Sequence, residues 1–202
     1  MDIEYEVKFT NVNKDKVRNK LASLGAKLIR GEFLQKRTVF FLPSGHEVEG
    51  GWLRVRDEGN KVTMTFKVVK GKNIQDQMET TLVVDDFEKA KRFLTDIGCV
   101  AKSYQENKRE LWILDGVEIT IDEWPFVHPY VEVEGRSENE VKEVSAKLGF
   151  KWEKAVIGAT HTVTSQQYGI PVKVLDDEIP LIVFSGENPY KKWLSEHQGN
   201  PI

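Results

Sequence analysis

Apolar and polar residues alternate in short stretches along the first 135 residues, a pattern typical of β-strands. In "IEYEVKF" (3–9), Glu4, Glu6 and Lys8 project to one side and the apolar residues to the other, since side chains alternate across a strand. Short connections such as "DEGN" (57–60) predict antiparallel hairpins. We therefore predict an α+β, mainly β fold, a closed eight-stranded antiparallel barrel with helices packed outside. The predicted strands are 3–9, 34–41, 51–57, 61–69, 75–84, 106–114, 117–124 and 129–135.

Three stretches carry apolar residues at helical spacing, each with a polar cap candidate before it and a glycine near its end. They are 13–26, 85–98 and 137–150. We expect Val17, Leu21 and Leu24 to cover one apolar patch of the sheet. The second helix should cover another patch with Phe87, Ala90, Phe93, Leu94 and Ile97.

The last fifty residues lose this regularity, although their apolar content argues against disorder. One more helix is expected within "KWEKAVIGATHTVTSQQYG", which begins at residue 151. We predict a barrel domain over 1–150 and a C-terminal extension over 151–202 that packs on it.

Composition excludes several classes of function. The net charge of −3 provides no global field for nucleic acid or an anionic membrane, so we expect neither as a partner. Cys99 is the single cysteine, which excludes an internal disulfide and a thiolate metal cluster. No apolar run approaches the length of a bilayer-spanning helix. A cytoplasmic, soluble protein is expected.

Like charges recur two residues apart on the polar face of three predicted strands: Glu4 and Glu6, Arg54 and Arg56, Glu132 and Glu134. A plain solvated face explains each strand taken singly. Paired like charges, however, repel across about 7 Å unless an opposite charge lies between them. A divalent cation between carboxylates, or a phosphate between guanidinium groups, provides that charge. The expected interior set is Lys8, Arg37, Arg54, Arg56, Lys67, Arg109, Glu4, Glu6, Glu79, Asp122, Glu132 and Glu134.

These residues separate into an acidic and a basic wall. The acids lie mainly on the first and last two strands, which adjoin in a closed barrel, and the bases lie on the strands between them. Such an enclosure suits a metal-bound polyanion: carboxylates hold Mg²⁺ or Mn²⁺, and Arg and Lys bind the remaining phosphate oxygens.

The order of motifs resembles the CYTH superfamily of triphosphate tunnel metalloenzymes. "EYEVK" is similar to its opening ExExK motif, and "LRVR", "TFK", "METTL", "NKREL", "TIDEW" and "YVEVEG" follow in the family's order. The resemblance implies a tunnel that binds a linear triphosphate, with Glu4, Glu6 and Lys8 as catalytic residues. It implies metal ligands at Glu4, Glu6, Asp122, Glu132 and Glu134. Lys8, Arg54, Arg56, Lys67 and Arg109 resemble the family's phosphate clamps. With Arg37 and Glu79 from the expected interior set, they are the expected substrate-binding residues.

Some positions depart from the family pattern. Gln77 stands where many members carry arginine, Asn107 where lysine is common, and Arg37 where many show aspartate. Members often supply a basic residue from a C-terminal helix, a role open to Lys151 or Lys154. Each of the five tryptophans is expected to pack in a core rather than stack on a base.

Three functions therefore stay open. The first is a metal-dependent phosphohydrolase acting on tripolyphosphate, ATP or thiamine triphosphate. The second is a class IV-type adenylate cyclase that converts ATP to cyclic AMP and pyrophosphate. The third is a polyphosphate- or nucleotide-binding module without turnover. A monomer or a homodimer is expected.

Overall fold

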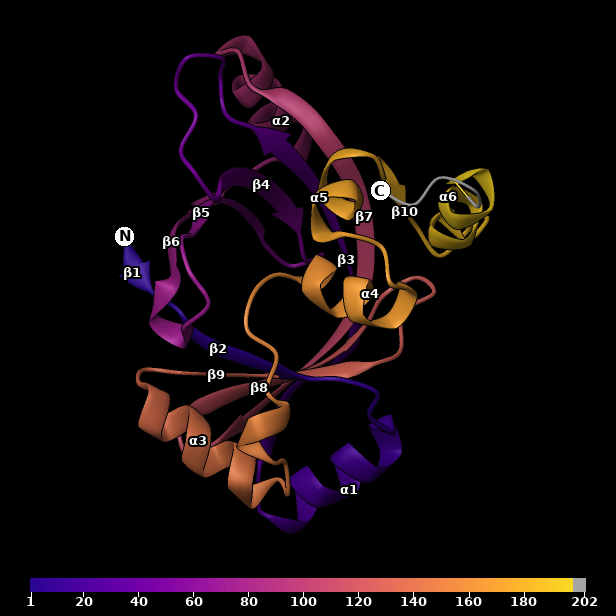
Figure 1. Cartoon of the computed structure of the whole chain (residues 1–202). Coiled ribbons are helices and arrows are strands. Elements are labelled where there is room, and N and C mark those ends of the chain that lie inside the picture. Colours follow the sequence, from indigo (N-terminus) through magenta and orange to yellow (C-terminus); the bar gives the residue numbers. More distant parts are fainter. Residues whose placement is uncertain (198–202) are drawn as a thin grey trace.

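A computed structural model describes residues 1–197 of the chain. Its main feature is one continuous antiparallel sheet, ordered β1-β6-β5-β4-β3-β7-β8-β9-β2, which curls into a nearly closed barrel (Figure 1). The strands are β1 (Asp2–Ile3), β2 (Tyr5–Phe9), β3 (Lys27–Phe41), β4 (Gly51–Asp57), β5 (Val62–Val69), β6 (Gln77–Val84), β7 (Val100–Leu114), β8 (Val117–Glu123), β9 (Tyr130–Gly135) and β10 (Leu181–Ile182). The predicted fold class is confirmed.

The strand count differs from the prediction, because nine strands rather than eight follow one another in the sheet. The predicted first strand is divided at Glu4 into β1, which pairs with β6, and β2, which pairs with β9. At the division the amide nitrogen of Glu4 donates to the carbonyl oxygen of Gln77 at 2.9 Å. One extended segment therefore joins both ends of the sheet.

Two strands, β3 and β7, are much longer than predicted. Each has 15 residues, and they pair from Lys27↔Ile113 to Phe41↔Val100. Register shifts between Leu28 and Phe33 bend the pair. The pattern predicted only the later part of each strand. On β3 the early residues contain the shifts between Leu28 and Phe33, and on β7 they contain a shift opposite Val39 and Phe40.

Helices cover the outside of the barrel. The described helices are α1 (Lys14–Ser23), α2 (Phe87–Asp96), α3 (Glu138–Lys147), α4 (Thr160–Tyr168), α5 (Val172–Asp177) and α6 (Pro189–His197), with short turns η1 (Ile74–Asp76) and η2 (Trp152–Lys154). Helices α1 and α3 share a core with the outer faces of β2, β8 and β9, where Leu21, Ile119 and Val141 are buried (Figure 1). None of these helices has the length and apolar character needed to span a bilayer.

Helix α2 covers its patch with a narrower face than predicted. Ala90 and Leu94 are buried beside Phe40 and Val55, but Phe93 and Ile97 are 55% and 50% exposed. The expectation for those two side chains was wrong, since a ten-residue helix presents only one stripe to the sheet.

Residues after η2 form a second core against the barrel. Val163 and Leu175, from α4 and α5, are buried with Trp124 and Tyr130 of the barrel, and α6 adds Trp193. Strand β10 pairs in parallel with β7. The helix expected within residues 151–169 is α4, and α5 and α6 lie beyond that stretch, where no helix was predicted.

Candidate active site

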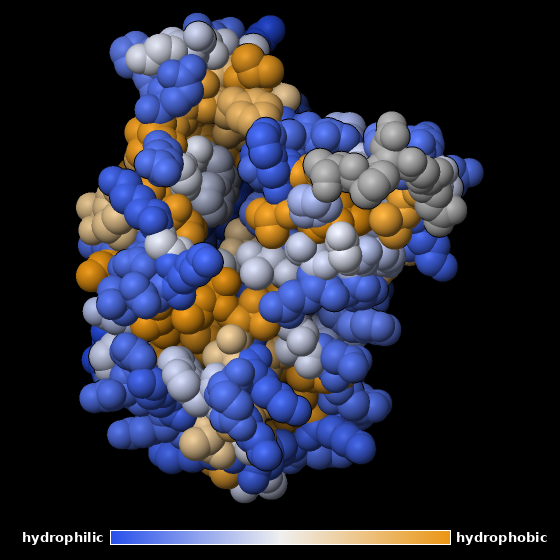
Figure 2. Space-filling model, in the orientation of Figure 1, coloured by the Kyte–Doolittle hydropathy of each residue, from blue (hydrophilic) through white to orange (hydrophobic). Residues whose placement is uncertain are grey.

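The polar face of the barrel strands encloses a charged cavity of about 280 Å³, which we call the tunnel. Figure 2 shows the hollow in the molecule between the upper strands and the C-terminal helices. With the exception of Asp122, all the predicted interior residues line it. The strand alternation therefore placed these side chains on the correct face, and their ligand roles stay predictions.

Three carboxylates meet at one end of the tunnel. Glu4, Glu6 and Glu134 each offer an oxygen, and these oxygens lie within 4.8 Å of one another. Their closeness follows from the sheet, because Glu6 and Glu134 are cross-strand partners on β2 and β9. Burial together with Glu6, Glu4 and Glu118 raises the pKa of Glu134 to about 8. The cluster therefore carries an excess of negative charge.

Two lysines partly neutralise this acidic end. Lys8 is bonded to Glu6, and its Nζ lies 3.3 Å from Oε1 of Glu132. Burial opposes the charge on Lys8, but the attraction of Glu6 and Glu132 prevails and raises its pKa. Lys67 Nζ lies 2.5 Å from Oε2 of Glu4 and 3.6 Å from Oε2 of Glu79.

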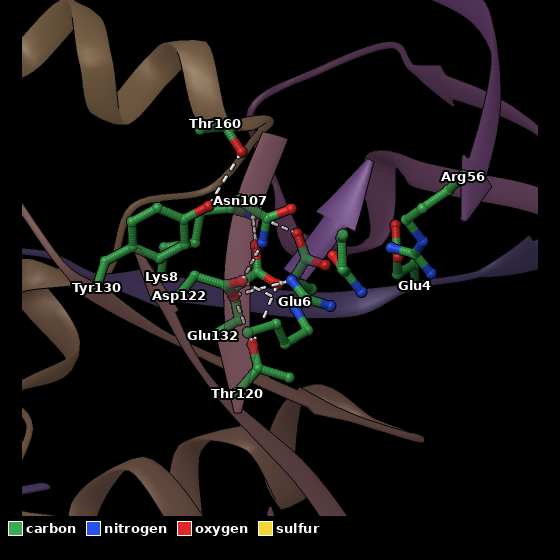
Figure 3. A network of polar contacts seen from close by, with 12 residues as sticks. Glu4, Glu6, Lys8, Arg56, Asn107, Thr120, Asp122, Tyr130, Glu132 and Thr160 are labelled. Carbon is green, nitrogen blue, oxygen red and sulfur yellow. Dashed lines mark hydrogen bonds and ion pairs between the residues drawn. The ribbon is translucent and has the colours of Figure 1, made fainter. Parts of the chain in front are cut away.

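Asp122 belongs to a saturated network of polar contacts, which Glu132 and Lys8 connect to the carboxylate cluster (Figure 3). Arg109 donates two hydrogen bonds to Asp122, from Nε to Oδ1 at 2.9 Å and from Nη2 to Oδ2 at 2.8 Å. Asn107 and Thr120 donate to the same oxygens at 2.8 and 2.7 Å. Arg109 also binds Glu132. Asp122 and Glu132 thus face Arg109 in this structure and lie outside the three-carboxylate cluster.

Arginines dominate the opposite wall. Arg56 Nη2 lies 2.7 Å from Oε1 of the buried Glu58, and burial with the nearby Arg54 lowers the pKa of Arg56 to about 10. Arg37 is the cross-strand partner of Arg56. Burial, followed by repulsion from Arg54 and Arg56, lowers the pKa of Arg37 well below its usual value. Because carboxylates balance only part of the positive charge on this wall, a bound anion would stabilise it.

The structure adds residues to the tunnel that the sequence did not single out as site residues. Glu118 shares the period-two face of Asp122, so the alternation could have found it. His161 and Asp176 come from the extension, where no pattern indicated them. Lys151 and Lys154 are exposed and are absent from the described lining of the tunnel.

Two tryptophans line the tunnel, in different environments. Trp124 is buried, as expected, and its ring lies 4.6 Å from the guanidinium carbon of Arg37. Trp52 is half-buried and also borders a second, more open cavity of about 720 Å³, which Gly51, Lys102 and His161 help to line.

A barrel with a carboxylate cluster facing arginines across its interior defines a charged-tunnel protein, and sequence comparison supplies the family. The chain matches the CYTH domain model over residues 2–163 and belongs to that family. No curated protein sequence matches it. It is similar to the PH1012 protein of Pyrococcus horikoshii OT3, with 27% identity, 76% of this chain and 94% of that chain covered, and a TM-score of 0.64.

Two further solved structures share the fold. A proposed adenylate cyclase of Vibrio parahaemolyticus has 12% identity, covers 81% of this chain and 98% of its own, and gives a TM-score of 0.70. HpAC1 of Hippeastrum, described with a dominant triphosphatase activity, has 15% identity, covers 85% and 99%, and gives a TM-score of 0.57. At these identities the likeness shows the fold alone.

Proposed function

We propose that the protein is a metal-dependent phosphohydrolase that cleaves inorganic or organic triphosphates in its tunnel. The observation that carries the proposal is the opposition of the Glu4, Glu6 and Glu134 cluster to Arg54 and Arg56 within one enclosure. Membership of the CYTH family supports it.

The carboxylate cluster fits a hard divalent cation such as Mg²⁺ or Mn²⁺. Its three ligands are oxygen donors from β2, from β9 and from Glu4, which joins β1 to β2. The raised pKa of Glu134 reflects burial and the neighbouring carboxylates. When bound there, a divalent cation supplies charge stabilisation at phosphate oxygens and activates water. Glu132 and Asp122 are further candidate ligands if Arg109 turns from them to substrate.

The basic wall would bind and orient the phosphate chain. Arg54 has a single described side-chain bond, Nη2 to Thr65 Oγ1 at 3.4 Å, so its guanidinium is free to bind phosphate. Lys8, Lys67 and Arg109 already lie beside the acids, where they can bind the phosphate oxygens next to the cation site. Cations at fixed positions favour the charge that develops as the phosphoryl group leaves. This scheme needs no covalent nucleophile.

One observation favours the adenylate cyclase as a second candidate. The cavity of about 720 Å³ adjoins the tunnel at Trp52 and His161 and is large enough for an organic group attached to the phosphates. A binding module without turnover is disfavoured, because anion binding alone does not require the carboxylates.

Product analysis separates the candidates. The protein is incubated with Mg²⁺ or Mn²⁺ and tripolyphosphate, ATP or thiamine triphosphate, and the products are resolved by chromatography. Orthophosphate release supports the hydrolase, 3′,5′-cyclic AMP with pyrophosphate supports the cyclase, and unchanged substrate supports the binding module. Glu134→Gln is the site variant, and Glu143→Gln, at an exposed position on α3, is its control.

A further inference from the structure

Arg37 is a buried cation whose partners are neutral. It is only 7% exposed, and its Nη2 donates to Oε1 of Gln35 at 2.9 Å and to Oδ1 of Asn107. Within residues 1–197 it forms no ion pair. By contrast, Lys8, Lys67, Arg56 and Arg109 each have a carboxylate partner.

Unused hydrogen-bond donors gather around Arg37. The Nε of Arg37, the Nε2 of Gln35 and the Nε1 of Trp124 are buried and have no acceptor in the described part of the chain. Gln35 is bonded to Arg37, and the Trp124 ring lies 4.6 Å from its guanidinium carbon. A buried donor left without a partner destabilises the folded state. Three such donors together indicate a missing acceptor.

Nearby acids do not supply that acceptor. Asp176, which reaches the tunnel from α5, is ion-paired with Lys102, and His161 Nδ1 lies 3.7 Å from its Oδ1. Glu58 is bound to Arg56 and Asp122 to Arg109. Arg54 and Arg56 instead add positive charge beside Arg37.

We propose that Arg37 and Trp124, with Arg54 beside them, form an anion subsite that holds a phosphoryl group without the help of a metal ion. A guanidinium group binds phosphate oxygens through a fork of donors, and the indole N–H adds a third donor. The subsite lies on the arginine wall, and the carboxylate cluster lies near Lys67 and Lys8. The subsite extends the proposed hydrolase site, and its role toward the substrate rests on that proposed function. It would let the tunnel bind a phosphoryl group when no metal ion is bound.

Binding of pyrophosphate in excess EDTA tests the subsite by calorimetry. Wild-type protein should bind, and Arg37→Gln should bind at least about tenfold more weakly, as expected for losing a charge-assisted hydrogen bond. Trp124→Phe keeps an aromatic ring and loses the indole N–H, so it should weaken binding by about threefold. Arg30→Gln is the matched control, because Arg30 lies outside the tunnel against Phe33 and Asn60.

Two outcomes overturn the inference: wild-type protein that binds no pyrophosphate in EDTA, or binding that Arg37→Gln leaves unchanged. Arg37→Gln should melt no lower than wild type without anion, since it removes an uncompensated buried charge. If it unfolds, Arg37→Lys, which keeps the charge but not the fork, must show the weakening instead. Measuring the affinity for ADP beside that for pyrophosphate shows whether the subsite prefers the phosphates of a nucleotide or inorganic phosphate. Pyrophosphate binding without hydrolysis of any triphosphate would support the subsite and refute the hydrolase.

Discussion

Substitution of Glu134 by glutamine should reduce the loss of folding stability that the metal-free protein shows as the pH rises. The pKa of Glu134 rises from its usual 4.5 to about 8 because the carboxyl group is buried near Glu6, Glu4 and Glu118. The folded state therefore holds a proton that the unfolded state releases above pH 4.5, and stability falls as the pH rises through this window. The full rise corresponds to a loss on the order of 5 kcal/mol above pH 8. For a chain of this size the melting temperature should drop by about 10–20 °C.

Thermal unfolding in EDTA, from about pH 5 to about pH 9, measures this effect. Wild type and the exposed control Glu143→Gln should lose stability with rising pH. Glu134→Gln should lose less, and the remaining slope reflects Glu6 and Glu118, whose pKa values burial also raises. Mg²⁺ should restore wild-type stability at the alkaline end, because a cation replaces the proton between the carboxylates. A wild-type melting temperature that is constant or rises over this range would refute the reasoning, and so would an equal slope in Glu134→Gln.

Three further predictions concern activity and binding. Hydrolysis of any triphosphate should require a divalent cation, and Glu4→Gln should lower the rate by at least roughly two orders of magnitude; full turnover in excess EDTA would contradict this. Arg54→Ala and Arg56→Ala should weaken tripolyphosphate binding, measured by calorimetry; unaltered affinity would count against the basic wall. Arg54→Ala should not lower the melting temperature, since it removes like-charge repulsion, whereas Arg56→Ala should lower it, because it leaves the buried Glu58 without its partner at 2.7 Å. Tripolyphosphate should be hydrolysed faster than ATP, and chromatography that finds mainly cyclic AMP would reverse this prediction.

The inward face of the barrel was predictable because it depends only on strand alternation. Lys8 on β2 and Glu132 on β9, for example, both face the tunnel, as the alternation of each strand requires. The same rule covers Glu118, whose place in the tunnel follows from its spacing to Asp122. Which carboxylates form a cluster was not predictable, because that depends on register and on the competing bonds of Arg109.

Only one helix of the C-terminal extension was predicted, and the others were missed for a different reason. Its helices α4 and α5 are short and bury small faces against side chains of the barrel, so their sequences carry weak periodicity. His161 reaches the tunnel only because α4 packs beside Trp124, a contact between distant parts of the chain. No local pattern encodes such a contact.

The extension also holds parts of the tunnel in place. The backbone of Val156 exchanges two hydrogen bonds of 2.8 Å with that of Lys8, which fixes β2 where its lysine enters the acid cluster. Phe126 has a φ of 64°, a conformation that costs a non-glycine residue about 1–2 kcal/mol. Its carbonyl oxygen accepts bonds from Tyr168 and Gln167 of α4, at 2.6 and 3.0 Å. The loop between β8 and β9 is therefore held in a strained form by α4, and this loop places Trp124 against Arg37.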